Sequence, residues 1–251
     1  MAINSVSDIK IIITGGASGI GAATATLLAQ DGAHVMIADV DEKGGKAVAE
    51  KLGKNVIFQK LDVTNADDWK AAVNAATDAF GGLNCVFNNA GIVGFGGVDE
   101  CTPQDFKRIM DINLNGIYLG IHSCAAALKK AGGGVIVNTS STAGLIGYGR
   151  LAGYTASKWA VRGLTKAAAI DLAKDGTRVV SIHPGGIETP MTEGLDNEAT
   201  TKTQAIPRLG KPEEVAKLAR YLFTEATFST GSEFVIDGGT TAGQTPDFPD
   251  A

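Results

Sequence analysis

The chain alternates short runs of β-branched, apolar residues with longer alanine-rich segments, and this alternation restricts its possible folds more than any other feature. Several of the short runs are almost continuously apolar, which is typical of strands that are covered on both faces. The expected strands are Ile9–Thr14, His34–Asp39, Val56–Leu61, Asn84–Asn88, Gly134–Ser140, Arg178–His183 and Glu233–Ile236. The expected helices are Ile20–Gln30, Glu42–Leu52, Ala66–Phe80, Pro103–Lys130, Tyr154–Lys174 and Pro212–Phe223. This order predicts an α/β fold: a doubly wound, seven-stranded parallel sheet with helices on both faces.

No break in composition, linker or internal repeat divides the 251 residues, so a single domain over residues 1–251 is expected. The net charge of −5 argues against a general nucleic-acid partner, because phosphate contacts require an excess of lysine and arginine. There is no apolar run of about 20 residues, so no membrane span is expected.

The cysteines and histidines are few and scattered. Cys85, Cys101 and Cys124 form no C-x-x-C pair, and residues 1–8 lack the basic start and apolar run of a signal peptide. Free thiols in a reducing, cytoplasmic location are therefore expected. With only three histidines, no metal site is predicted.

A glycine-rich turn follows the first expected strand and precedes an alanine-rich helix. It reads Thr14-Gly15-Gly16-Ala17-Ser18-Gly19-Ile20-Gly21. Glycines let the backbone approach a pyrophosphate closely, and the start of the helix offers unpaired N–H groups to it. The spacing is G-x-x-x-G-x-G rather than G-x-G-x-x-G, so a plain turn between strand and helix is the alternative.

A carboxylate ends each of the next two expected strands. Asp39 lies about 20 residues after the turn, where it can accept hydrogen bonds from ribose hydroxyls and repel a 2′-phosphate. The sequence therefore favours NAD over NADP, with a helix cap or a turn as the alternative role of Asp39. Asp62, followed by Val63, can reach the edge of an adenine ring or cap the helix that starts near Ala66.

Tyr154 and Lys158 are four residues apart in an expected helix, so both side chains lie on one helix face. A tyrosine titrates near pH 10, and a fixed positive charge nearby lowers that pKa. The pair is therefore interpreted as a general acid/base. Two side chains that merely extend from a helix surface are the alternative.

With these motifs the chain resembles the short-chain dehydrogenase/reductase family over about residues 9–240. The resemblance rests on T-G-x-x-x-G-I-G from Thr14, Asn88-Asn89-Ala90-Gly91, Asp111-Ile112-Asn113, Ser140-Ser141, Tyr154-x-x-x-Lys158, Pro184-Gly185 and Asp237-Gly238-Gly239. It implies a Rossmann domain and an enzyme that moves hydride between a nicotinamide cofactor and an alcohol or ketone. The implied cofactor-binding residues, together with those predicted above, are Gly15, Ser18, Gly19, Ile20, Gly21, Asp39, Asp62, Val63, Asn89, Ala90, Gly91, Tyr154, Lys158, Pro184, Gly185, Ile187 and Thr189.

The resemblance also implies a catalytic set. Tyr154 matches the acid/base, and Lys158 matches the residue that lowers its pKa and binds the nicotinamide ribose. Ser141 matches the serine that binds the substrate oxygen, with Ser140 as the lesser candidate. Asn113 matches the residue that holds a water in a proton relay through Lys158. A turn role for Ser141 and a helix-bending role for Asn113 are the alternatives.

The loops expected around the substrate are mostly apolar, which favours a neutral secondary alcohol or ketone, aryl or of medium chain length. The alternatives are a hydroxysteroid dehydrogenase, a 3-oxoacyl carrier-protein reductase and a non-catalytic dinucleotide sensor. A mobile lid is predicted over about residues 190–207. The helix from Tyr154 is apolar nearly all round, and the resemblance implies that it helps to form a homotetramer.

Overall fold

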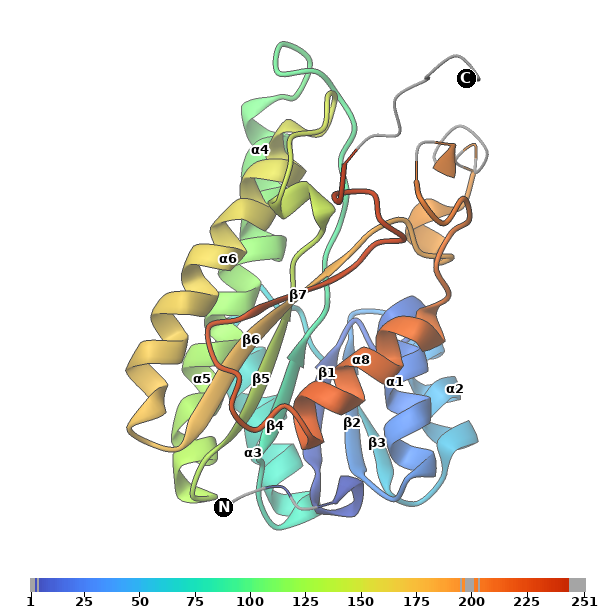
Figure 1. Ribbon diagram of the computed structural model, residues 1–251. Helices are drawn as coiled ribbons and strands as arrows, with labels where there is room; N and C mark the ends of the chain where they lie inside the picture. Colours follow the sequence, from blue (N-terminus) through green and yellow to red (C-terminus); the bar gives the residue numbers. More distant parts are fainter. Residues whose placement is uncertain (1–2, 4, 195, 197–200, 203, 244–251) are drawn as a thin grey trace.

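The seven expected strands form one parallel sheet. The computed structural model describes residues 3, 5–194, 196, 201–202 and 204–243. The strands run in the order β3-β2-β1-β4-β5-β6-β7, and each neighbouring pair is parallel (Figure 1). Their bounds are β1 Lys10–Thr14, β2 His34–Asp39, β3 Val56–Lys60, β4 Cys85–Asn88, β5 Gly134–Thr139, β6 Thr177–Pro184 and β7 Glu233–Ile236. The predicted fold is thus confirmed.

Helices cover both faces of the sheet because alternate strand side chains point to opposite sides. Ile11 and Ile13 belong to one buried cluster with residues of α1, α2 and α8, whereas Ile12 belongs to a second cluster with residues of α3, α5 and α6 (Figure 1). The helices are α1 Gly19–Gln30, α2 Glu42–Leu52, α3 Ala66–Phe80, α4 Pro103–Met110, α5 Gly116–Lys130, α6 Ala152–Ala173 and α8 Pro212–Thr224. In the described part of the chain, no helix is both long and apolar enough to cross a bilayer.

The predicted single helix Pro103–Lys130 is interrupted by a π turn, Asp111–Asn115. A π turn inserts one extra residue and is frequent at functional sites. Here it carries Asn113, whose side chain is fully buried and bonds backbone atoms of Ile92. Helical periodicity alone gives no sign of this insertion, because the hydrophobic pattern continues through it.

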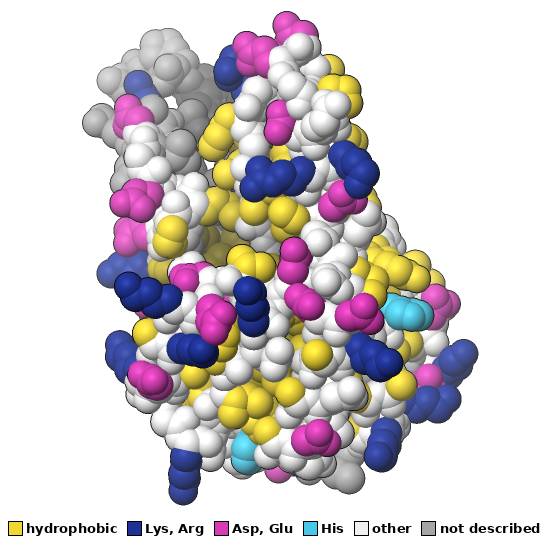
Figure 2. Space-filling view, turned by 180° about the vertical axis from the view of Figure 1, so that it is seen from behind, with side chains coloured by type: hydrophobic (Ala, Val, Ile, Leu, Met, Phe, Trp, Pro, Cys, Tyr) yellow, Lys and Arg dark blue, Asp and Glu magenta, His cyan; other side chains and the backbone are white. Residues whose placement is uncertain are grey.

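The strand order reverses between β1 and β4: after β1 the chain adds β2 and β3 on one side of the sheet, and after β4 it adds β5, β6 and β7 on the other side. In open α/β sheets this point forms the crevice in which ligands bind. Short 3₁₀ turns follow two of the strands that end at the same edge: Thr142–Gly144 after β5, and Pro190–Thr192 after β6. The molecule is hollowed on the face seen in Figure 2, where hydrophobic side chains gather around the opening.

Candidate active site

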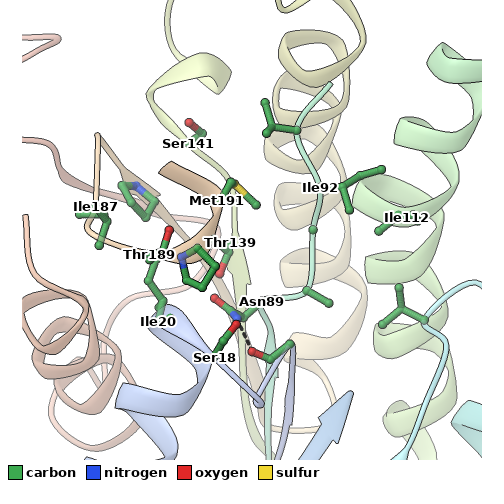
Figure 3. Close-up of a pocket in the computed structure, with 18 of the residues that line it drawn as sticks. Ser18, Ile20, Asn89, Ile92, Ile112, Thr139, Ser141, Ile187, Thr189 and Met191 are labelled. Carbon is green, nitrogen blue, oxygen red and sulfur yellow. Dashed lines mark hydrogen bonds between the residues drawn. The ribbon is translucent and has the colours of Figure 1, made fainter. Parts of the chain in front are cut away.

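A cavity of about 740 Å³ lies at the carboxyl edge of the sheet beside the reversal point. Figure 3 shows residues of the first turn of α1, of the segments after β4 and β6, and of the π turn facing this one space. All but two of the predicted site residues line it: Gly15, Ser18, Gly19, Ile20, Asp39, Asp62, Val63, Asn89, Ala90, Gly91, Ser141, Tyr154, Lys158, Pro184, Gly185, Ile187 and Thr189. The two exceptions are Gly21 and Asn113, which are buried but do not line the cavity.

The glycine-rich turn needs its glycines for two different reasons. Gly15 and Gly19 have φ values of 64° and 52°, a region that side chains with a Cβ rarely adopt. A Cβ on Gly21 would lie 2.1 Å from the carbonyl oxygen of Gly15, so only glycine lets the helix start this close to the turn. The N-cap Ser18 makes no side-chain cap hydrogen bond, and the first turn of α1 borders the cavity.

Two other residues cap the helices that Asp39 and Asp62 were considered to cap. The α2 helix is capped by Asp41, whose side chain accepts a hydrogen bond from the backbone of Gly44, and α3 is capped by Asn65. The helix-cap interpretation is therefore wrong for both carboxylates. Asp62 instead accepts hydrogen bonds from the amide and hydroxyl of Thr64, at 2.9 and 2.8 Å.

Asp39 does serve in a turn, and it also faces the cavity. One oxygen accepts a hydrogen bond from the Asp41 amide at 2.9 Å, and the other accepts one from the Ala17 amide at 3.0 Å. The second bond ties the end of β2 to the glycine-rich turn. The carboxylate is thereby held at the edge of the cavity in a fixed orientation.

Thr14 supports the site and was not predicted to do so, although it stands at the start of the glycine-rich motif. Its hydroxyl oxygen accepts hydrogen bonds from the amides of both Asn89 and Ala90, each at 3.0 Å. The Asn89 side chain returns a bond to the Thr14 carbonyl at 3.1 Å. These contacts fasten the end of β4 to the glycine-rich turn. The signal for it was a hydroxyl directly before the first glycine.

Tyr154 and Lys158 meet at the cavity as their spacing predicted. Lys158 Nζ lies 5.5 Å from the centre of the Tyr154 ring and donates a hydrogen bond to the Thr139 carbonyl at 2.9 Å. The lysine is only 3% exposed. Because burial disfavours the charged form, it lowers the pKa of Lys158 to about 8.

The sequence predicted that the charge of Lys158 lowers the pKa of Tyr154. With the protein's own groups alone, this prediction is wrong. Burial raises the pKa of the phenol above its ordinary value, a hydrogen bond from Ser141 opposes that rise, and Tyr148 adds to it. Since desolvation is the largest of these effects, the nearby lysine does not make Tyr154 acidic on its own. The four-residue spacing identified Lys158 as the neighbour of Tyr154, but it could not show how deeply the two side chains are buried.

The two serines have different surroundings. Ser141 starts the 3₁₀ turn Thr142–Gly144 and accepts a hydrogen bond from the Ala143 amide at 3.1 Å, so its own O–H remains for Tyr154 or a ligand. The turn interpretation therefore holds together with a position in the cavity. Ser140 is buried, and its hydroxyl donates to the Lys158 carbonyl at 2.9 Å. It supports α6, in agreement with its ranking as the lesser candidate.

Asn113 supports the cavity wall from behind. Its side-chain N–H groups donate to the Ile92 carbonyl at 2.9 Å and the Ser157 hydroxyl at 3.1 Å. Both donors are thus occupied, which agrees with the helix-bending alternative. A Cβ on Gly91 would lie 3.2 Å from Asn113 Oδ1 and 3.5 Å from Lys158 Nζ, so the three residues pack directly together.

Only part of the loops around the expected substrate site reaches the cavity. Ile92 and Val93 after β4 and Met191 after β6 line it, whereas Phe95 is largely exposed and Arg150 pairs with Glu100 at 3.0 Å. Arg108, one helical turn before Ile112, also lines the cavity and was not predicted. The predicted lid over 190–207 lies partly outside the described residues, and residues 245–251 lie wholly outside them.

Comparisons with known proteins agree with this geometry. A family profile described as enoyl-(acyl carrier protein) reductase matches residues 15–241. The 3-alpha-(or 20-beta)-hydroxysteroid dehydrogenase of Mycobacterium tuberculosis is 44% identical over 233 residues, which is 92% of this chain and 89% of that protein. The cyclohexanol dehydrogenase of an Acinetobacter species is 41% identical over 244 residues, covering 95% of this chain and 97% of the other.

A solved structure is similar over most of its length. The 3-ketoacyl-(acyl-carrier-protein) reductase from Brucella melitensis, in complex with NADH, superposes with a TM-score of 0.88 at 34% identity, covering 91% of this chain and 96% of that one. The family profile spans the glycines of the glycine-rich turn and the Tyr154–Lys158 pair. The chain belongs to the short-chain dehydrogenase/reductase family.

Proposed function

We propose that the chain is an NAD-dependent oxidoreductase that interconverts a secondary alcohol and its ketone. The observation that carries this proposal is the convergence of Ser141, Tyr154 and Lys158 on one cavity, whose other end is formed by the glycine-rich turn and Asp39. A non-catalytic sensor would not require the three polar groups to meet there. Their presence favours an enzyme that acts on a small molecule.

The residues present fit a dinucleotide. The first turn of α1 borders the cavity without a side-chain cap, so its N–H groups and the positive end of the helix dipole are available to a pyrophosphate. Ser18, Gly19 and Ile20 would hold the phosphates, Asp39 the adenosine ribose, and Asp62 and Val63 the adenine edge. Asn89–Gly91 would form the floor, with Pro184, Gly185, Ile187 and Thr189 around the nicotinamide.

Bound NAD⁺ would supply the hydride acceptor, and the positive charge of its nicotinamide ring would favour the phenolate form of Tyr154. Tyr154 then serves as the base that takes the hydroxyl proton of the alcohol, and as the acid that returns it to a ketone oxygen. Ser141 and Tyr154 together donate to that oxygen, where negative charge grows during reduction. Lys158 holds its ammonium group beside them, in a site where burial strengthens its field.

Replacing Asp39 tests the choice of cofactor. In Asp39→Asn the amide oxygen keeps one acceptor for the backbone of the turn but removes the charge that repels a 2′-phosphate. We expect the ratio of kcat/KM for NAD to that for NADP to fall by about tenfold or more, which corresponds to about 1.4 kcal/mol. Asp62→Asn is the matched control and should leave the ratio nearly unchanged. An unaltered ratio in Asp39→Asn contradicts the ribose role.

The substrate that we favour is a secondary alcohol on a ring. The side chains at the far end of the cavity, Ile92, Val93, Ile187 and Met191, are apolar. The names of two relatives describe cyclohexanol and a hydroxysteroid whose hydroxyl is at the 3-position, on a six-membered ring, or at the 20-position, on the side chain. An apolar wall excludes water and accommodates a hydrocarbon ring well.

The decisive assay follows NADH formation with a panel of alcohols under identical conditions. The panel contains cyclohexanol, a 3α-hydroxysteroid, a linear secondary alcohol and, in the reverse direction, a 3-oxoacyl thioester. Highest kcat/KM with cyclohexanol or with the 3α-hydroxysteroid supports a secondary alcohol on a ring, and a preference for the steroid over cyclohexanol selects the hydroxysteroid alternative. Highest kcat/KM with the linear alcohol contradicts the ring proposal. Preference for the thioester would make the chain a 3-oxoacyl reductase. That alternative stays open because the similar Brucella enzyme is itself in complex with NADH.

We further propose a homotetramer in a reducing, cytoplasmic setting, where Cys85, Cys101 and Cys124 stay free thiols. Large apolar side chains stand out from the outer faces of α5 and α6: Tyr118, Trp159 and Ile170 are 50%, 47% and 78% exposed. Such side chains are typical of surfaces that a second subunit covers. Light scattering after gel filtration should give four chain masses, and Ile170→Glu should reduce that number. A wild-type monomer at micromolar concentration contradicts the proposal.

A further inference from the structure

His183 is the one histidine on the carboxyl edge of the sheet, and the proposed reaction does not use it. It lies on β6 and is fully buried. Its Nδ1 is 3.2 Å from the Ser141 carbonyl oxygen, and its Nε2 is 2.9 Å from the Ser181 hydroxyl. The carbonyl can only accept, so Nδ1 must carry the hydrogen. In the neutral ring Nε2 is then the acceptor, and the Ser181 hydroxyl donates to it.

The ring stays neutral at ordinary pH in spite of charged neighbours. Burial lowers the pKa of His183, the bond to Ser141 and the Glu233 carboxylate on β7 oppose this, and Arg162 and Lys158 on α6 lower the pKa further. Arg162 and Glu233 are themselves paired at 2.9 Å. At neutral pH the single hydrogen on Nδ1 therefore points at Ser141.

The bond to Ser141 lies where the ladder between β5 and β6 ends. The ladder pairs Thr139 with Ile182, and it continues for one more bond, from the Ser140 amide to the Ile182 carbonyl at 2.8 Å. The next rung would be a bond from the backbone nitrogen of Pro184 to the Ser140 carbonyl, and proline has no N–H to donate. The side chain of His183 donates instead to the following carbonyl, that of Ser141. This bond therefore joins the backbone beyond β5 to β6 after the ladder has stopped.

We propose that His183 is a positioning residue, which fixes Ser141 through its carbonyl and so aims the serine hydroxyl at Tyr154 and the substrate oxygen. Besides His183, the Ser141 carbonyl accepts a bond only from within the 3₁₀ turn, from the Gly144 amide at 2.9 Å, among the described residues. That local bond shapes the turn but does not fix it to the sheet. The histidine supplies the fixed point. This inference rests on the proposed function of Ser141.

Two amide substitutions separate positioning from simple filling of the core. In His183→Asn the side-chain N–H lies where Nδ1 was and can still donate to the Ser141 carbonyl. In His183→Gln the amide reaches instead toward Ser181, and the donor to Ser141 is lost. Both variants are polar and uncharged, and both leave the neighbouring charges in place. The difference between them therefore isolates the bond to Ser141.

We expect His183→Asn to keep kcat within about threefold of the wild type and His183→Gln to lose about tenfold or more, since a small displacement of a donor costs much of its effect. KM for NAD should be unchanged in both. In His183→Gln the pKa of Tyr154 should rise, because the phenolate loses the Ser141 donor. This pKa is followed by phenolate absorbance, taken as the difference between each protein and the same protein with Tyr154→Phe. His34→Gln, at the opposite end of β2 from the cavity, is the control and should change stability alone.

The absorbance titration needs no substrate, so failure of this inference is distinguishable from failure of the proposed function. If no alcohol is oxidised, yet the two variants differ in the pKa of Tyr154, the positioning role stands and the proposed reaction is wrong. If the wild type is active but His183→Asn and His183→Gln have equal kcat values and equal pKa values for Tyr154, the positioning role is refuted. A loss of kcat in His183→Asn that exceeds the loss in His183→Gln also refutes the positioning role.

Discussion

Replacing Tyr154 with phenylalanine will lower kcat for a ring-borne secondary alcohol by about a thousandfold or more while the protein stays folded and binds NAD. The substitution removes only the phenolic oxygen. That oxygen is both the proposed proton acceptor and one of two donors to the reacting oxygen, and each role alone contributes about a hundredfold or more. A thousandfold loss corresponds to about 4 kcal/mol of transition-state stabilisation.

The measurement is kcat from initial rates of NADH formation, together with the dissociation constant for NADH from its fluorescence. Tyr118→Phe is a matched control, because that tyrosine lies on the outer face of α5 and stacks on His122. It should retain the wild-type kcat. Activity in Tyr154→Phe within about tenfold of the wild type would show that another group moves the proton.

Replacing Lys158 with methionine will remove activity and, at the same time, stabilise the protein at neutral pH when no cofactor is added. Burial lowers the pKa of Lys158 from 10.5 to about 8, so at pH 7 the folded protein holds a charged ammonium that it disfavours. At about 1.4 kcal/mol per pKa unit, this costs about 3 kcal/mol of folding free energy. Methionine has similar length and carries no charge. Its loss of the bond to Thr139 offsets part of the gain.

The pH dependence gives this prediction its sign. Below pH 8 the lysine is charged in both the folded and the unfolded chain, and the full penalty is present. Between about pH 8 and 10.5 the unfolded chain binds more protons than the folded one, so the wild type gains stability as pH rises. The advantage of Lys158→Met should therefore be largest near pH 7 and shrink toward pH 10.

Chemical denaturation of both proteins at several pH values tests this difference, because all other titrating groups are shared. The exposed Lys54→Met serves as the control and should show no such pH dependence. A Lys158→Met protein that is less stable than the wild type at pH 7, or that gains stability relative to it as pH rises, would contradict the buried-ammonium account.

The order of the strands and helices could be predicted because each apolar run is short, β-branched and bounded by glycine or a polar residue. The bounds of β2, α2, α3 and β7 agree with the expected ones. The π turn at Asp111–Asn115 could not be predicted, since one inserted residue hardly changes a hydrophobic pattern. The cap assignments failed at Asp39 and Asp62 because a second polar residue lay within three positions and local spacing does not choose between them.

The composition of the cavity could be predicted because parallel strands end at one edge, so residues far apart in sequence must meet there. The pKa of Tyr154 and the anchoring of Ser141 could not be predicted in this way. The direction of the Tyr154 pKa depends on burial, and the anchoring of Ser141 depends on where the ladder between β5 and β6 ends. Both are properties of packing and register, which no short motif encodes.

The separation between capping and cavity residues has a consequence for how this enzyme can change. Asp41 and Asn65 hold the starts of α2 and α3, while Asp39 and Asp62, a few positions away, face the cavity. Mutation can therefore exchange the cavity-facing carboxylates without removing the cap of either helix. Natural selection can then alter what this part of the cavity accepts while the starts of both helices stay fixed.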